Sequence, residues 1–197
     1  MMSKHKYKER AVQYARDVVS GRNKKGNNFR ECVRFLADLK REDLELREKE
    51  ADFVIGIIET VMVHRQGEAL TGEPLTNTPL LLQDWQIFII YNLVGFYWAG
   101  TNERRYKEAF IFVPRKNGKT MFIAALAFGL ALLERRSGAR IYIVAASQKQ
   151  ACESFKDILY TLKYKQMIQD FRVLDNNAEH SISCEFMDRY GRPDGSI

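Results

Sequence analysis

The sequence predicts an α/β fold in which helices flank a parallel β-sheet, preceded by a helical N-terminal region. Three observations lead to this prediction. After about residue 80 the patterns typical of strand, helix, strand and helix alternate, which is the signature of a parallel sheet. Before that point the apolar residues recur mainly at helical spacing. One strand-to-helix turn also contains Gly118-Lys119-Thr120, a tripeptide suited to holding phosphate.

The N-terminal region is predicted to contain three helices. They cover residues 5–19, 28–39 and 42–64. Residues 66–79 then hold two Gly, two Pro and three Thr without hydrophobic periodicity, which is typical of an exposed connection. We therefore predict a helical region at 1–80 and an α/β domain at 81–197.

The α/β region is predicted from its apolar runs. In chain order we expect a buried helix at 83–98, a strand at 108–113, a helix at 118–134, a strand at 140–145, a helix from an N-cap at Ser147 to about 164, weak strands at 172–174 and 181–186, and a turn-rich end at 191–195. The aromatic and β-branched residues of the first helix leave a strand possible for part of it. The strands at 108–113 and 140–145 alternate little, as expected of strands buried on both faces.

The turn after the first of these strands resembles a phosphate-binding loop. The standard pattern is G-x-x-x-x-G-K-[ST], and the chain reads Val113-Pro114-Arg115-Lys116-Asn117-Gly118-Lys119-Thr120, which fits all but the first glycine. The tripeptide alone is a weak signal, and an ordinary strand-to-helix turn is the competing interpretation. Its position after an apolar strand and before an apolar helix favours phosphate binding.

Each residue type in the loop suits a triphosphate. Gly118 lets the backbone turn so that amide groups face phosphate oxygens, and the helix adds its positive N-terminal end. Lys119 would reach the β- and γ-phosphates, and the Thr120 hydroxyl would coordinate Mg²⁺. Arg115 and Lys116 bring further positive charge, which an anion would neutralise. The sequence thus predicts ATP and Mg²⁺ as cofactors.

Composition is that of a globular protein, with 46% hydrophobic and 28% charged residues. The net charge of +6 is concentrated in residues 1–30, where nine Lys or Arg face two acidic residues. This basic arm could contact nucleic acid, or it could simply aid solubility. Three cysteines without close spacing favour neither a disulfide framework nor a zinc site, and indicate a reducing cytoplasm.

Neither a secretory signal nor a membrane span is expected. The first ten residues are charged and no apolar stretch follows them. Residues 85–102 are interrupted by polar residues and glycines, and the apolar run at 121–133 is shorter than the roughly 20 residues needed to cross a bilayer. Both segments are predicted to be buried helices.

The run from Pro114 to Thr120 resembles the deviant phosphate loop of the large terminase subunits of tailed bacteriophages, ATPases that pump viral DNA into capsids. In that family the first glycine is commonly replaced and an arginine stands early in the loop, as Val113 and Arg115 do here. Leu82-Gln83-Asp84-Trp85-Gln86 resembles the family's adenine-contacting motif, and 141–151 resembles the next strand and helix start. The resemblance covers about residues 75–165.

The resemblance implies specific roles and partners. Gln86 would read the adenine edge, and Arg115 would stabilise charge during hydrolysis beside Lys119. The implied partners are double-stranded viral DNA, the small terminase subunit and the portal protein, with a homo-oligomeric ring in the intact motor. The implied location is the host bacterial cytoplasm, at the procapsid portal. Arg115 and Lys119 are therefore the expected catalytic residues.

A phosphate-loop ATPase also needs an acidic residue after another buried strand to hold Mg²⁺, and a second carboxylate to activate water. Asp175 and Asp188 are poor candidates, because neither follows a full apolar strand. The chain thus resembles the first part of a large terminase subunit, from a truncated prophage gene, a split reading frame or a cloned fragment. We expect weak ATP binding and very slow hydrolysis from such a chain.

Two other functions fit the same residues. One is another phosphate-loop DNA translocase or helicase-like ATPase, which would differ in the motifs beyond Ile197. The other is a non-catalytic remnant that acts as a DNA- or protein-binding module through its basic arm.

Overall fold

The computed structural model describes residues 6–24, 26–69, 71–135, 140–176 and 179–184. The chain forms two compact units. The first comprises Met1–Ile55 and Leu82–Phe112, and the second comprises Gly56–Leu81 and Val113–Ile197. Each unit is described separately below. The predicted turn-rich end at 191–195 lies outside the described residues.

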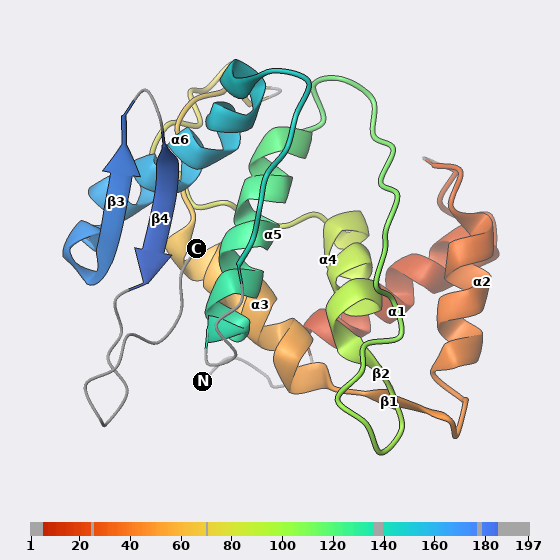
Figure 1. The fold of residues 1–197 in the computed structure, drawn as a ribbon. Helices are drawn as coiled ribbons and strands as arrows, with labels where there is room; N and C mark the ends of the chain where they lie inside the picture. The colour runs from red at the N-terminus through yellow and green to blue at the C-terminus, as the bar shows by residue number, and fades with distance from the viewer. Residues whose placement is uncertain (1–5, 25, 70, 136–139, 177–178, 185–197) are drawn as a thin grey trace. The chain divides into compact units, whose positions relative to one another are not determined.

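The first unit is mainly helical. Its elements are α1 (Lys6–Val19), α2 (Phe29–Asp38), β1 (Leu44–Leu46), the start of α3 (Glu48–Val61), α4 (Asp84–Ile90), a π-helical turn η1 (Tyr91–Gly95) and β2 (Phe96–Trp98) (Figure 1). Phe35 of α2 stands in the core, where its ring meets those of Phe88 and Phe96 edge-on at centroid distances of 5.2 and 5.7 Å. Such aromatic contacts add to the burial that holds α2 on the unit.

Residues 42–64 form a strand and then a helix, so the prediction of one long helix there is wrong at its start. Leu44 and Leu46 flank the exposed Glu45, which is the period-two pattern of a strand. This strand pairs antiparallel with β2, in the register Leu44↔Trp98 to Leu46↔Phe96. The same pairing makes the end of the predicted helix at 83–98 a strand, as its aromatic residues allowed.

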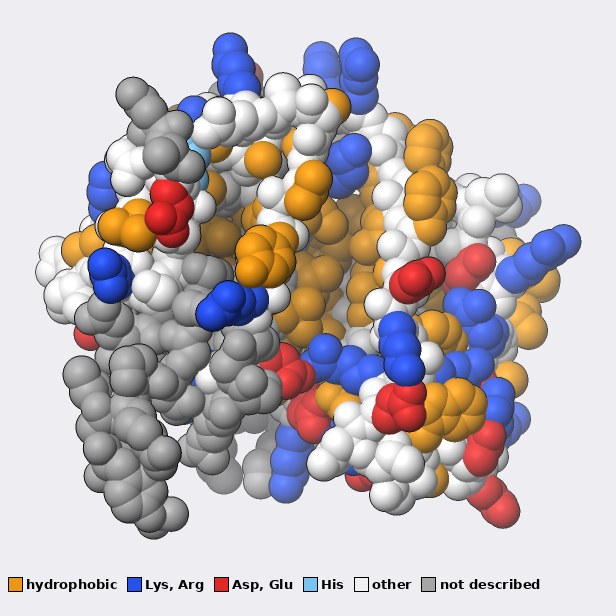
Figure 2. All heavy atoms as spheres, in the orientation of Figure 1, with side chains coloured by type: hydrophobic (Ala, Val, Ile, Leu, Met, Phe, Trp, Pro, Cys, Tyr) orange, Lys and Arg blue, Asp and Glu red, His pale blue; other side chains and the backbone are white. Residues whose placement is uncertain are grey.

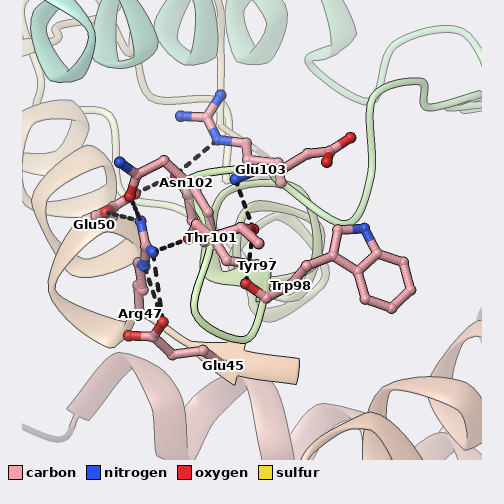
Figure 3. A network of polar contacts seen from close by, with 9 residues as sticks. Glu45, Arg47, Glu50, Tyr97, Trp98, Thr101, Asn102 and Glu103 are labelled. Carbon is pink, nitrogen blue, oxygen red and sulfur yellow. Dashed lines mark hydrogen bonds and ion pairs between the residues drawn. The ribbon is translucent and has the colours of Figure 1, made fainter. Parts of the chain in front are cut away.

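A polar network fastens the corner after β1 (Figure 3). The guanidinium of Arg47 lies 4.0 Å from the centre of the Tyr97 ring and donates to the Thr101 carbonyl and to Oδ1 of Asn102. The Tyr97 hydroxyl donates to Glu50 and accepts from Nε of Arg104. The backbone N–H of Arg47 also donates to the Gly95 carbonyl at 2.8 Å. Arg47 therefore joins β1 to the loop that follows β2.

The second unit contains α5 (Lys119–Leu133), α6 (Gln148–Tyr164), a 3₁₀ turn η3 (Ile168–Asp170), and the strands β3 (Phe171–Asp175) and β4 (His180–Cys184). The apolar residues of α5 surround the helix, so it is largely buried and packs against α6 (Figure 1). The helices at 118–134 and 147–164 are confirmed. Ser147 is the N-cap of α6, its Oγ accepting the N–H of Gln150 at 3.4 Å.

The weak strand predicted at 172–174 is confirmed, and the one predicted at 181–186 is confirmed as far as Cys184, beyond which it lies outside the described residues. The two strands form an antiparallel hairpin. β3 pairs with β4 in the register Phe171↔Cys184 to Asp175↔His180. Within the described residues the strands pair only in antiparallel fashion. The chain is thus a mixed helix and strand fold with small antiparallel sheets.

The predicted buried strands at 108–113 and 140–145 are extended but have no strand partner in the described part of the chain, so the prediction of buried strands is wrong there. Phe110 and Phe112 are 92% and 83% exposed, and Tyr142 and Val144 are 76% and 89% exposed. Figure 2 shows hydrophobic side chains at the surface along these extended segments. The physical reason is that a central strand is buried only when strands flank it and helices cover both faces.

Length and hydropathy together decide whether a helix can span a membrane. Among the residues that the structure describes, no helix is both long enough and apolar enough to cross a bilayer.

Candidate nucleotide-binding site

The loop before α5 has the backbone shape that a phosphate site requires. Gly118, the N-cap residue of α5, adopts φ 68° and ψ 18°, which is the left-handed region that favours glycine. Lys116 also has a positive φ, of 66°. Asn117 closes the loop by donating from Nδ2 to the carbonyls of Pro114 and Arg115, at 3.3 and 3.2 Å. Asn117 therefore shapes the loop from within.

The start of α5 presents free backbone donors. No side chain caps this helix, and its hydrogen bonding begins with the Phe122 N–H, which donates to the Gly118 carbonyl at 2.9 Å. The N–H groups of the first turn precede that bond and have no intrahelical acceptor. Together with the helix dipole they form an environment that favours an anion.

A pocket of about 420 Å³ lies against the loop, within the second unit. Its volume falls in the range of ligand sites, roughly 300–1,000 Å³. It is lined by His64, Arg65, Gln66, Val113, Pro114, Arg115, Lys116, Gly118, Lys119, Thr120, Met121, Glu153 and Asp157. Seven of the eight predicted loop positions thus line one cavity, and Asn117 acts on the loop backbone instead.

The pocket includes a charged cluster that the loop motif did not predict. Arg65 donates from Nε to Oδ1 of Asp157 and from Nη2 to Oε2 of Glu153, each at 2.7 Å. Both carboxylates stand on α6, four residues apart and so on one face of the helix. The i, i+4 spacing of these two carboxylates was visible in the sequence. Their partner Arg65, which directly precedes the predicted connection at 66–79, was not predicted.

The cluster shifts the pKa values of its members. Hydrogen bonds from Lys156 and then Arg65 lower the pKa of the Glu153 carboxyl, so that group stays ionised at neutral pH. The Asp157 hydrogen bond raises the pKa of Arg65 further. Burial lowers the pKa of His64 despite the opposing charge of Asp157, so the imidazole is neutral at pH 7.

Thr120 is a residue of this pocket that could hold a magnesium ion together with the phosphates of a nucleotide. Among the described residues, no group of three or more His, Cys, Asp or Glu is placed to hold a metal. Mg²⁺ often takes one or two protein oxygens and completes its shell with phosphates and water, for which an exposed threonine hydroxyl such as that of Thr120 suffices.

The other predicted residues fall elsewhere. Gln86 belongs to α4 in the first unit, where its side chain is buried and Oε1 accepts the N–H of Gln83 at 2.8 Å. A carboxamide oxygen can accept a second hydrogen bond, so this cap does not preclude contact with adenine. Asp175 ends β3 with Oδ1 2.8 Å from Nδ1 of His180, and Asp188 lies outside the described residues. The adenine role of Gln86 stays a prediction.

A comparison with protein-family models decides the family. The model for the ATPase domain of the terminase large subunit matches residues 84–194, more than half of the chain. The chain belongs to the terminase large-subunit family. The matched range of this terminase chain includes Gln86, the whole predicted loop at 113–120, α5 and α6. No curated protein and no solved structure matched the chain.

The family match gives the pocket its chemical context. An ATPase domain must bind a nucleotide, and residues 84–194 of this terminase contain the helix start and loop described above. The cations on the loop and the free first-turn donors of α5 suit polyphosphate. His64 and Arg65 line the pocket but lie before the matched range.

Proposed function

We propose that this chain is the ATP-binding part of the ATPase motor of a phage terminase large subunit, which drives translocation of viral DNA into the capsid. One observation carries the proposal: Lys119 and Thr120 follow a left-handed Gly118 at an uncapped helix start and line the same pocket. The backbone donors and the lysine suit the phosphates, since the field of a helix N-terminus favours negative charge.

Each loop residue has a proposed role. Lys119 contacts the β- and γ-phosphates, and Thr120 contributes its hydroxyl to Mg²⁺. Arg115 stabilises charge during transfer, while Lys116 adds to the attraction of the nucleotide. Pro114 and Asn117 set the loop, and Gln86 reads the adenine edge. When bound, Mg²⁺ neutralises phosphate charge.

We also propose that the segments at 108–113 and 140–145 belong to a parallel sheet of the phosphate-loop type, flanked by helices. The extended segments at 108–113 and 140–145 carry exposed apolar side chains that a sheet would bury. Leaving several large apolar side chains in water is costly, at about 1.5–3 kcal/mol each. The predicted division into a helical region at 1–80 and an ATPase domain at 81–197 belongs to the same proposal.

The proposed partners follow from the motor function. They are double-stranded viral DNA, the small terminase subunit and the portal protein, with further copies of the chain in a ring. The surplus of positive charge in residues 1–30 is consistent with contact to a phosphate backbone. The proposed location is the host bacterial cytoplasm, at the procapsid portal.

Hydrolysis by this chain is expected to be very slow. A general base must be free to accept a proton from water. Of the described residues lining the pocket, the two carboxylates are Glu153 and Asp157, and both are paired with Arg65. Turnover comparable to that of an intact motor would contradict this expectation.

The test of the proposed function is a titration with MgATP. We expect saturable binding by the 197-residue chain and a large loss of affinity in Lys119→Ala. Lys163→Ala, which removes an exposed lysine from the last turn of α6, is the matched control and should bind as the unaltered chain does. Equal affinities of the unaltered chain and Lys119→Ala would refute the site.

Two further observations distinguish the competing functions. If MgATP fails to raise the melting temperature while DNA binds tightly, a non-catalytic binding module replaces the motor proposal. If the gene continues with helicase motifs instead of an acidic strand end and a metal nuclease, a helicase-like translocase replaces it.

A further inference from the structure

The connection between α3 and α4 is fastened to α6 at three points, all within the second unit. Oγ1 of Thr161, a fully buried residue, lies 3.4 Å from the Val63 N–H and 3.5 Å from the Val63 carbonyl. The Tyr160 hydroxyl donates to Oδ1 of Asn77 at 2.6 Å. Arg65 makes the third attachment, and it alone of the three lies in the phosphate-loop pocket.

The two carboxylates that hold Arg65 differ in how easily they could release it. The Asp157 side chain is 10% exposed, so loss of its ion pair would strand a nearly buried charge. The Glu153 side chain is 37% exposed and has a second cation, because Nζ of Lys156 lies 3.1 Å from its other oxygen. Release of Arg65 from Glu153 therefore costs less free energy than its release from Asp157.

The charge of the pocket favours such an exchange. Its lining contains four cationic side chains, those of Arg65, Arg115, Lys116 and Lys119, and two carboxylates. The neutral His64 adds nothing, so the surplus is two positive charges. A guanidinium forms short, strong hydrogen bonds with phosphate, and its planar edge can hold two oxygens.

We propose that Arg65 is a further phosphate-binding cation of this pocket, which keeps Asp157 as an anchor and exchanges Glu153 for the phosphates of the nucleotide. The inference rests on the proposed nucleotide site. It makes Arg65 a nucleotide-binding residue, and it links occupancy of the pocket to the attachment of the connection between α3 and α4 to α6. Glu153 competes with the nucleotide for Arg65 and keeps its ion pair with Lys156 when it is displaced.

The proposal predicts opposite effects for the two partners. Arg65→Ala should weaken MgATP binding by about tenfold or more, the equivalent of one charge-assisted hydrogen bond. Glu153→Gln should strengthen MgATP binding by several-fold, because it removes the competing charge and keeps the size of the side chain. Arg65→Lys should fall between the unaltered chain and Arg65→Ala, since it keeps the charge without the planar fork.

The experiment measures dissociation constants for MgATP, MgADP and pyrophosphate by calorimetry, with melting temperatures recorded for every variant. Arg172→Ala and Glu179→Gln are the matched controls, because each changes the same charge in the second unit outside the phosphate-loop pocket. Both controls should bind as the unaltered chain does. If Arg65→Ala weakens the binding of pyrophosphate as well as that of MgATP, Arg65 contacts the phosphates.

The outcomes separate this inference from the proposed function. Suppose that Lys119→Ala loses MgATP binding while the affinity of Arg65→Ala changes no more than that of Arg172→Ala. This result keeps the nucleotide site and overturns the role of Arg65. A lower melting temperature with unchanged affinity in Arg65→Ala shows a structural tether and also overturns it. Weaker binding by Glu153→Gln overturns the exchange. Absence of MgATP binding by the unaltered chain refutes the proposed function and with it this inference.

Discussion

The guanidinium of Arg65 donates from Nε to Oδ1 of Asp157 over 2.7 Å and joins two residues that stand 92 positions apart in the sequence. The contact fixes the start of the connection at 66–79 against α6. It also brings a buried carboxylate to the edge of a pocket whose other charges are mostly positive.

Asp157→Asn should lower the free energy of unfolding by about 1–3 kcal/mol, as expected for a partly buried hydrogen bond between charged groups. Glu153→Gln should cost less than about 1 kcal/mol, because its carboxylate is well exposed to solvent. Urea denaturation followed by circular dichroism measures both values. Equal losses in the two variants would contradict the anchor role of Asp157.

The stability of the second unit should depend on the protonation of His64. Burial lowers the pKa of the folded imidazole below its ordinary value of 6.5, so the unfolded chain binds the proton more tightly. Stability from this group is therefore complete above about pH 6.5 and is lost as the pH falls toward the folded pKa. The urea concentration at the unfolding midpoint should decrease as the pH is lowered from about 7.5 to about 5.5, and the decrease should be smaller in His64→Gln. Parallel curves for the two proteins would exclude His64 as the source.

Gly118→Ala should reduce MgATP affinity more than it reduces stability. A methyl group at this position meets open space, so the cost is strain at φ 68°, about 1 kcal/mol. The altered backbone would also turn the loop amides away from phosphate. Asn tolerates left-handed backbone, so Gly118→Asn should bind better than Gly118→Ala. The reverse order in a calorimetric titration would contradict the need for a left-handed residue.

Arg47→Ala should destabilise the first unit by about 2 kcal/mol, because it removes hydrogen bonds and a cation–π contact with Tyr97. Arg22→Ala is the matched control, since Arg22 makes a solvent-exposed pair with Asp17 in the same unit and should cost much less than Arg47→Ala. Thermal and urea unfolding measure both. Similar losses would show that the network in Figure 3 adds little to stability.

Cys32 should resist alkylation in the folded chain. Burial, reinforced by the charge of Glu31, raises the pKa of its thiol to about 12, and the residue is fully buried. Thiolate is the reactive form, so iodoacetamide at about pH 8 should label Cys32 slowly. Peptide mass spectrometry with and without denaturant measures the rate. Rapid labelling under native conditions would contradict the packing of α2 described here.

Local sequence patterns predicted much of the secondary structure, because helices are encoded by short-range spacing. The N-cap at Ser147 and the glycine at 118 are read directly from residue type, and both have the expected backbone geometry. The helix predicted at 42–64 failed at its start because Leu44 and Leu46 pair with β2, some 50 positions away. Propensity alone does not weigh such a pairing.

The sequence by itself determined which residues stand at the start of α5: a glycine, a lysine and a threonine before an apolar helix, a pattern that predicts phosphate binding. Only the tertiary structure decided what surrounds the loop. Arg65 reaches the pocket through contacts with residues 88 and 92 positions distant, and no local periodicity encodes such a contact. The apolar segments at 108–113 and 140–145 show the same limit, because a strand is buried only where other strands and helices cover it.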